Sequence, residues 1–137
     1  MADEAALERL ADRALAALEH AYAPYSGFRV GAALLMPDGS MASGANVENA
    51  AYPAGLCAER AALAAAVGAG AREFVAVAIA SEADHPTPPC GMCRQALVEF
   101  APSLTVVSVT RGGARAVWSL DSLLPHAFTP KSLRDRK

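Results

Sequence analysis

Apolar residues recur at three- and four-residue intervals near the start of the chain. Charged residues such as Glu8, Asp12 and Glu19 lie between them, a spacing typical of an amphipathic helix with one buried face. Pro24 would end this helix, because proline lacks a backbone donor. The apolar positions are Leu7, Leu10, Ala11, Ala14, Leu15, Leu18 and Tyr22.

The middle of the chain predicts a hairpin, a helix and a strand. Apolar runs at 30–36 and 41–46 flank Pro37-Asp38-Gly39-Ser40, which suits a tight turn, so we expect a β-hairpin. The segment 55–67 is alanine-rich without internal proline or glycine, which favours a helix. A continuous apolar run at 74–80 has the length of a buried strand.

The last third of the chain begins with a proline-rich loop. Prolines at 86, 88 and 89 predict an extended segment, and we expect a helix at 95–100 after it. The β-branched run at 105–110 predicts a strand. A glycine turn at 111–113 leads to a further strand at 114–119, and so short a link requires antiparallel pairing.

The expected order is α-β-β-α-β-α-β-β with a short helical tail. Such alternation predicts an α/β fold in which one mixed sheet of about five strands is covered by helices. The length of 137 residues and the lack of a linker predict a single domain over 1–137. The charged residues 131–137 are expected to fray.

Composition and charge limit the classes of partner. Hydrophobic residues make up 53% of the chain, but many are alanines and aromatics are only 6%, so self-association would add useful burial. A net charge of −2 gives no basic surplus for a nucleic-acid polymer or an acidic membrane. The longest nearly apolar stretch, 61–71, is shorter than the ~20 residues of a membrane span.

Cysteine usage points to thiol or metal chemistry. The opening Met-Ala-Asp-Glu carries acids where an export signal would be basic, so we expect a cytoplasmic location under reducing conditions. Three cysteines then predict free thiols or metal ligands and not a disulfide framework. They fall in Cys57-Ala58-Glu59-Arg60 and Pro89-Cys90-Gly91-Met92-Cys93-Arg94, each at the start of an expected helix.

Helix N-termini stabilise thiolates, the form that binds zinc. Three cysteines without a fourth fit an open, catalytic zinc site better than a closed structural one. Glu59 would be near enough to exchange protons with a water at the open position without ligating the metal. Arg60 and the two helix ends would offset the negative charge of the thiolates.

Two other interpretations remain open at this point. Cys90 and Cys93 could form a redox pair, with Cys57 as a core thiol. Alternatively, His85 could act as a fourth ligand and close a structural Cys₃His site.

The spacing Cys-Ala-Glu followed by Pro-Cys-x-x-Cys is that of the three-cysteine zinc deaminases of bases. Over nearly its whole length the chain resembles the small homotetrameric cytidine deaminases. The resemblance rests on residues 24–34 (PYSGFRVGAAL), residues 44–50 (GANVENA), residues 90–95 (CGMCRQ) and residues 123–128 (LLPHAF).

The resemblance implies a three-layer cytidine deaminase-like fold and one Zn²⁺ per subunit held by Cys57, Cys90 and Cys93. It implies Glu59 as the proton shuttle while zinc-bound hydroxide attacks C4 of cytidine or 2′-deoxycytidine, in pyrimidine nucleoside salvage. Arg60 would hydrogen-bond a ligand sulfur, and Arg94 and Gln95 would support the site.

The same resemblance implies the substrate contacts. Phe28 would pack on the pyrimidine ring beside Ala58, and Asn46 and Glu48 would bind ribose hydroxyls. In a homotetramer with shared sites, neighbouring subunits would contribute Ala50, Tyr52 and Phe128. If Glu48 is a buried acceptor, it would repel phosphate and favour nucleosides over nucleotides. The main enzymatic alternative is a deaminase of a modified nucleoside such as blasticidin S.

Overall fold

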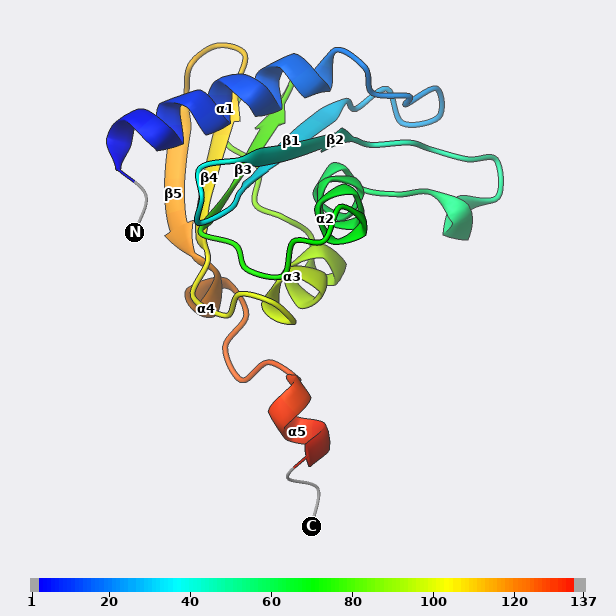
Figure 1. Cartoon of the computed structure of the whole chain (residues 1–137). Helices are drawn as coiled ribbons and strands as arrows, with labels where there is room; N and C mark the ends of the chain where they lie inside the picture. The colour runs from blue at the N-terminus through cyan, green and yellow to red at the C-terminus, as the bar shows by residue number, and fades with distance from the viewer. Residues whose placement is uncertain (1–2, 135–137) are drawn as a thin grey trace.

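A mixed five-stranded sheet forms the centre of the molecule, in a computed structural model that describes residues 3–134 (Figure 1). The strand order is β2-β1-β3-β4-β5. The strands are β1 (Val30–Leu35), β2 (Met41–Ala45), β3 (Ala76–Ser81), β4 (Thr105–Thr110) and β5 (Arg115–Ser119).

Both hairpins expected from the turn residues are present. β1 and β2 pair antiparallel with Ala33 opposite Ser43, and β4 and β5 pair antiparallel with Val107 opposite Val117. β3 pairs antiparallel with β1 and parallel with β4. The prediction of a mixed sheet of five strands is therefore confirmed.

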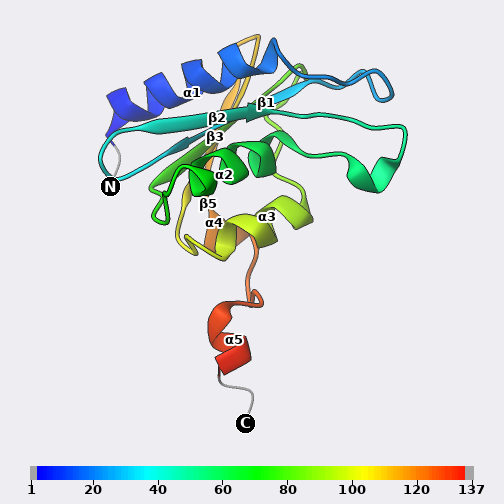
Figure 2. The same cartoon turned by 45° about the vertical axis from the view of Figure 1, so that its right-hand side comes forward.

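Helices cover the sheet on both faces, which confirms the three-layer arrangement. Figures 1 and 2 show α1 across one face and α2 and α3 side by side on the other, with α5 extending away from the body. The helices are α1 (Glu4–Leu18), α2 (Ala58–Gly68), α3 (Gly91–Val98), α4 (Leu120–Leu123) and α5 (Pro130–Arg134), with a 3₁₀ turn η1 (Tyr52–Ala54) before α2.

Each face of the sheet packs into its own apolar cluster. In β1, Ala32 and Leu34 join the cluster under α2 and α3, whereas Ala33 and Leu35 join the cluster under α1. This alternation follows from the two-residue period of a strand. Because both faces are covered, the sequence of β1 is a continuous run of apolar residues.

Two glycines allow the helices to approach the sheet closely. A Cβ on Gly31 would lie 2.2 Å from the carbonyl oxygen of Ala14 in α1. A Cβ on Gly44 would lie 2.6 Å from the backbone nitrogen of Ala62 in α2. Only glycine leaves room for backbone at these distances.

Several expected boundaries differ from the structure. α2 begins at Ala58 and not at Gly55, because Cys57 is its N-cap and residues 52–54 form a separate turn. α3 begins at Gly91 and ends at Val98, so the expected helix at 95–100 is placed too late. The proline-rich loop ends at Cys90, the N-cap of α3. No proline lies within α3, so the helix can begin directly at Gly91.

The expected fraying of 131–137 is wrong for its first part. Residues 131–134 belong to α5, whose first residue is Pro130, a favourable helix start. The Ser132 hydroxyl accepts a hydrogen bond from the Thr129 nitrogen, which caps the same end. The rest of that expectation, residues 135–137, lies outside the described residues.

Among residues 3–134, none of the helices combines the length and apolar character needed to cross a membrane. The single domain over 1–137 stays a prediction.

Candidate metal centre and adjoining cavity

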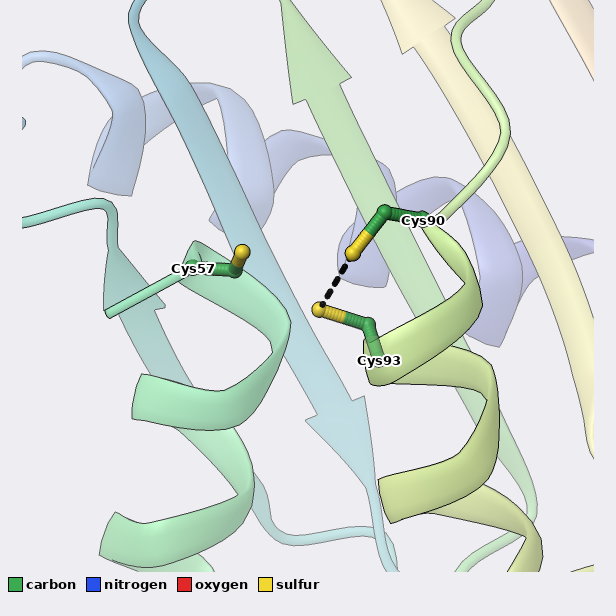
Figure 3. A group of neighbouring side chains, drawn as sticks. All are labelled: Cys57, Cys90 and Cys93. Carbon is green, nitrogen blue, oxygen red and sulfur yellow. Dashed lines mark hydrogen bonds between the residues drawn. The ribbon is translucent and has the colours of Figure 1, made fainter. Parts of the chain in front are cut away.

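The three cysteine thiols meet between the starts of α2 and α3. Cys57 is the N-cap of α2, Cys90 is the N-cap of α3, and Cys93 lies in the first turn of α3. The three Sγ atoms lie within 4.8 Å of one another. Figure 3 shows them around one small space, with Cys90 donating to Cys93 at an Sγ to Sγ distance of 3.6 Å.

The topology explains why residues so far apart in sequence converge. α3 follows β3, and α2 follows β2, which is separated from β3 by β1 alone. Both helices return across the same face and so begin at the same end of the sheet. In open α/β sheets this end, beyond the carboxyl ends of the parallel strands, is where ligands bind.

Positive groups face the thiols. Neither N-cap cysteine makes a side-chain capping bond, so both sulfurs remain available at positive helix ends. The Arg60 guanidinium donates from Nη2 to the Cys57 sulfur at 3.7 Å. Burial opposes ionisation of Cys90, but hydrogen bonds from the Cys93 and Met92 backbone and from neighbouring thiols outweigh it and lower its pKa.

Cys93 shows the opposite behaviour. Its pKa is raised, first by burial and then by the negative charges of Glu59 and Cys57. Three thiolates therefore do not coexist easily without a cation among them. A bound dication would remove this penalty, and sulfur ligands are those that Zn²⁺ favours. The donor set fits zinc with three protein ligands and one further position.

Glu59 lies beside the thiols and is only 5% exposed. Its pKa is raised, because burial outweighs the backbone hydrogen bond, the Arg60 charge and the Cys93 side-chain contact that lower it. A buried carboxyl with a raised pKa is protonated more readily than an exposed one, which suits a group that accepts and then donates a proton.

A cavity of about 260 Å³ opens next to the thiols. Phe28, Asn46, Glu48, Ala58 and Glu59 line it together with two of the cysteines, so the structure brings seven of the predicted site residues to one space. Its complete lining is Ser26, Phe28, Val30, Asn46, Glu48, Cys57, Ala58, Glu59, Ile79, Thr87, Pro88 and Cys90.

Asn46 and Glu48 hold the loop in front of β1. The Asn46 amide accepts from the Val30 nitrogen and donates to the Phe28 carbonyl, both at 2.9 Å. Glu48 accepts from the backbone nitrogens of Tyr25 and Ser26 at 2.9 and 3.0 Å, and from the Ser26 hydroxyl. Glu48 is half-buried in the isolated chain, so the expectation of a buried acceptor is wrong. Hydrogen bonds from these donors, and not burial, fix its position.

Three of the predicted substrate contacts lie outside the lining of this cavity. Ala50 and Tyr52 belong to the exposed connection from β2 to α2, where the Tyr52 ring is 77% exposed and contacts Tyr25 edge to face at 6.2 Å. Phe128 is 58% exposed in the segment before α5. Their assignment to a neighbouring subunit's site stays a prediction.

Arg94 and Gln95 support the site from α3. Arg94 Nε donates to the Pro89 carbonyl and Nη1 to the Leu123 carbonyl, both at 2.7 Å. Gln95 donates to the Phe128 carbonyl at 2.7 Å. Arg94 thus fixes the residue before Cys90, and Gln95 ties the C-terminal segment to the same helix.

The other cysteine interpretations fit this geometry poorly. Cys57 lies with the other two thiols and is not a separate core residue. Within residues 3–134, the group that could hold a metal consists of the three cysteines, and the exposed His85 is not part of it.

The sequence assigned no role to Ser26, Ile79 or Thr87, which also line the cavity. Ser26 stood inside a recognised motif, and Thr87 stood among prolines as the one residue there with a hydroxyl. Ile79 carried no signal, because it reads as an ordinary strand residue.

Comparison with known proteins gives consistent matches. Residues 4–109 match the family model described as "Cytidine and deoxycytidylate deaminase zinc-binding region". A cytidine deaminase of Halalkalibacterium halodurans is 45% identical over 130 residues, which cover 93% of this chain and 98% of that relative. A probable cytidine deaminase of Dictyostelium discoideum is 41% identical and covers 93% and 86%.

Solved structures agree with the sequence matches. The crystal structure of cytidine deaminase from Burkholderia pseudomallei superimposes with a TM-score of 0.85 at 48% identity, covering 88% of this chain and 98% of that one. That from Mycobacterium tuberculosis gives 0.78 at 38% identity and covers 89% and 96%.

Proposed function

The chain belongs to the cytidine and deoxycytidylate deaminase family, and on that premise we propose that it hydrolyses cytidine and 2′-deoxycytidine to uridine and 2′-deoxyuridine with release of ammonia. The observation that carries the proposal is the convergence of three thiols within 4.8 Å beside a buried carboxyl, at the wall of a cavity. Phe28, Asn46 and Glu48 also line that cavity.

Cys57, Cys90 and Cys93 would hold one Zn²⁺ per subunit. Bound there, zinc supplies Lewis acidity that makes a water acidic enough to react near neutral pH. The Arg60 guanidinium donates a hydrogen bond to the Cys57 sulfur and so places a positive charge beside this ligand. The helix N-termini add to the same stabilisation.

Glu59 carries the protons. Its carboxylate takes one from the attacking water and passes it to ring N3 as the water oxygen bonds to C4. It then takes the proton of the new C4 hydroxyl and delivers it to the amino group, the C4–N bond breaks as the C4=O bond forms, and ammonia leaves. The raised pKa of Glu59 suits this exchange, because an acid–base group works best near the ambient pH.

Phe28 would contact the pyrimidine ring, and Asn46 and Glu48 the ribose. Both polar side chains are held in place by the 25–30 backbone, which reduces the entropy lost on binding. Each retains capacity for a sugar hydroxyl, because a carboxylate offers about four acceptor sites and an amide two donors. The Glu48 charge would disfavour a nearby phosphate, so nucleosides are the expected substrates.

The chain would act as a homotetramer in the cytoplasm, in pyrimidine nucleoside salvage. Exposed aromatic residues at Tyr52 and Phe128 support shared sites, because large exposed apolar side chains often mark contact surfaces. Ala50 would contribute to the neighbouring site from the same connection as Tyr52. A net charge of −2 supports a small-molecule substrate over a nucleic-acid polymer.

The blasticidin-type alternative is not favoured, since the curated relatives quoted above carry the name cytidine deaminase or probable cytidine deaminase. The test is to incubate the purified zinc-loaded protein with cytidine and with 2′-deoxycytidine and follow the ultraviolet change of deamination. Conversion by the wild type and its loss in Glu59→Gln is the expected result. A folded protein with one zinc per chain that converts neither nucleoside would overturn the proposal.

A further inference from the structure

The connection from β3 to α3, residues 82–90, ends at Cys90 of the candidate metal centre. Three of its nine residues lack a backbone N–H that could donate a hydrogen bond. Prolines occupy positions 86, 88 and 89, and proline has no N–H to donate. The Ala83 nitrogen donates to the Ser81 hydroxyl at 3.3 Å, and the contacts farther along the segment use carbonyls and side chains. In Figure 3 the chain enters Cys90 from this connection, immediately before α3.

Two buried serines hold the middle of this connection. The Ser108 hydroxyl on β4 donates to the Thr87 carbonyl at 2.7 Å. The Ser81 hydroxyl, at the end of β3, lies 3.2 Å from the Thr87 hydroxyl. Ser81 and Ser108 are both 0% exposed within otherwise apolar strands, where a hydroxyl without a partner is costly.

The strand register places these serines directly behind the cavity. Ser108 pairs with Ile79, which lines the cavity, and Ser81 lies two residues beyond Ile79 on the same strand face. Thr87, which forms these hydrogen bonds with the serines, and the next residue, Pro88, also line the cavity. Farther along, Arg94 holds the Pro89 carbonyl, so the segment is fixed at two successive points before Cys90.

We propose that Ser108 and Ser81 are positioning residues which, through Thr87, fix Cys90 and the Pro88 wall of the cavity relative to Glu59. This inference rests on the proposed function, because it concerns the same metal centre. Neither serine lines the cavity or belongs to the group of three thiols. Their effect is transmitted by the short, proline-stiffened chain from Thr87 to Cys90.

The experiment compares Ser108→Ala with Thr110→Val in the full-length protein. Thr110 is on the same strand, is 3% exposed, and uses its hydroxyl to accept from the Ala114 nitrogen at 3.0 Å. Both variants lose one buried hydroxyl hydrogen bond, but only Ser108 contacts the connection. The readouts are zinc affinity, by competition with a chromogenic chelator, thermal unfolding, and the separate kcat and KM for cytidine.

We expect Ser108→Ala to weaken zinc binding about tenfold, the effect of losing one hydrogen bond to a buried carbonyl, whereas Thr110→Val keeps wild-type affinity at a similar unfolding temperature. KM should rise in Ser108→Ala because Pro88 moves with the segment. Equal zinc affinity and equal KM in Ser108→Ala and Thr110→Val would overturn the proposal.

The Ser81 contact is tested by a double-mutant cycle of Ser81→Ala and Thr87→Val. Both single variants should weaken zinc binding by a similar factor, and the double variant by no more than either. Additive effects would show that the two hydroxyls act separately and would contradict the proposal. This cycle also stands in if Ser108→Ala fails to fold. Because zinc affinity is measured without turnover, an enzyme inactive on cytidine would refute the proposed function and leave this test intact.

Discussion

Gln95 donates a hydrogen bond of 2.7 Å to the backbone carbonyl of Phe128, which ties an exposed aromatic residue to the helix that presents Cys90 and Cys93. The bond fixes the backbone of Phe128, and the residue as a whole is 58% exposed. A residue with a fixed backbone and an exposed side chain is suited to the contact with a neighbouring subunit that we propose. That arrangement is the structural basis of the proposed shared site.

Replacing Phe128 tests the shared site. We expect Phe128→Ala to lower kcat/KM for cytidine roughly tenfold, the scale of one lost aromatic contact, with zinc content unchanged. Phe128→Tyr keeps the ring and should retain activity. Sedimentation of both variants checks assembly. Full activity in Phe128→Ala would exclude this residue from the site.

Glu59→Gln removes the proton carrier at nearly constant shape. We expect kcat to fall about a hundredfold to ten-thousandfold, while zinc content and unfolding temperature stay close to wild type. Glu99→Gln, which changes an exposed carboxylate at the C-cap of α3, is the control and should be fully active. Normal turnover in a zinc-loaded Glu59→Gln protein would rule out the mechanism.

Removing a thiol should remove the metal. Cys57→Ala leaves two sulfurs, so we expect loss of bound zinc on dialysis, loss of activity and a lower unfolding temperature, because metal binding stabilises the native state alone. Chelator treatment of the wild type should give the same temperature. Added zinc should restore the wild type and not the variant, and retention of stoichiometric zinc by Cys57→Ala would contradict the assignment.

Gly44→Ala should displace α2 from the sheet. The new Cβ would meet backbone atoms of α2 at 2.6 Å, and we expect destabilisation by about 1–3 kcal/mol together with weaker zinc binding, because α2 begins at Cys57. Gly68→Ala at the other end of α2 meets nothing within 4 Å and should be neutral or slightly stabilising. Equal denaturation midpoints for the two variants would refute the close-packing argument.

The Glu48 carboxylate should stabilise the fold in a pH-dependent way. Its pKa lies below the ordinary value of 4.5, chiefly because the Ser26 hydroxyl and nitrogen donate to it. A lowered folded pKa gives stability that is present above the ordinary value and lost as pH falls through the folded value. The difference in unfolding temperature between wild type and Glu48→Gln should therefore be constant near neutral pH. It should shrink as the pH falls below about 4.5. A difference that is independent of pH down to 3 would contradict this contact.

Sequence patterns predicted the layers of the fold and the grouping of the three cysteines well, because both rest on local rules. Periodicity identified α1, and the Pro37 to Ser40 turn identified the first hairpin. The thiol spacing indicated which cysteines meet. The start of α3 was missed because Gly91 is a poor helix former that follows a proline-rich loop. The N-cap position of Cys90 depends on where that loop ends.

Contacts between distant segments could not be predicted in the same way. Glu48 looked like a buried acceptor, but its position is set by backbone nitrogens of a loop more than twenty residues earlier in the chain. The bonds from Ser108 and Ser81 to Thr87 also depend on strand register. A serine in an apolar strand signals only that some partner exists, and the fold decides which one.

The alanine-rich core has a consequence for how this chain tolerates change. Alanines such as Ala32, Ala62 and Ala78 are fully buried against neighbouring elements. A methyl side chain has little volume that a substitution could remove. Most single substitutions at these positions add atoms. The usual hazard of a core, a void left by a shortened side chain, is therefore replaced by crowding. At these alanine positions the chain should tolerate only residues that are no larger. The restriction should be strictest in α2, which positions Cys57 and Glu59 at the candidate metal centre.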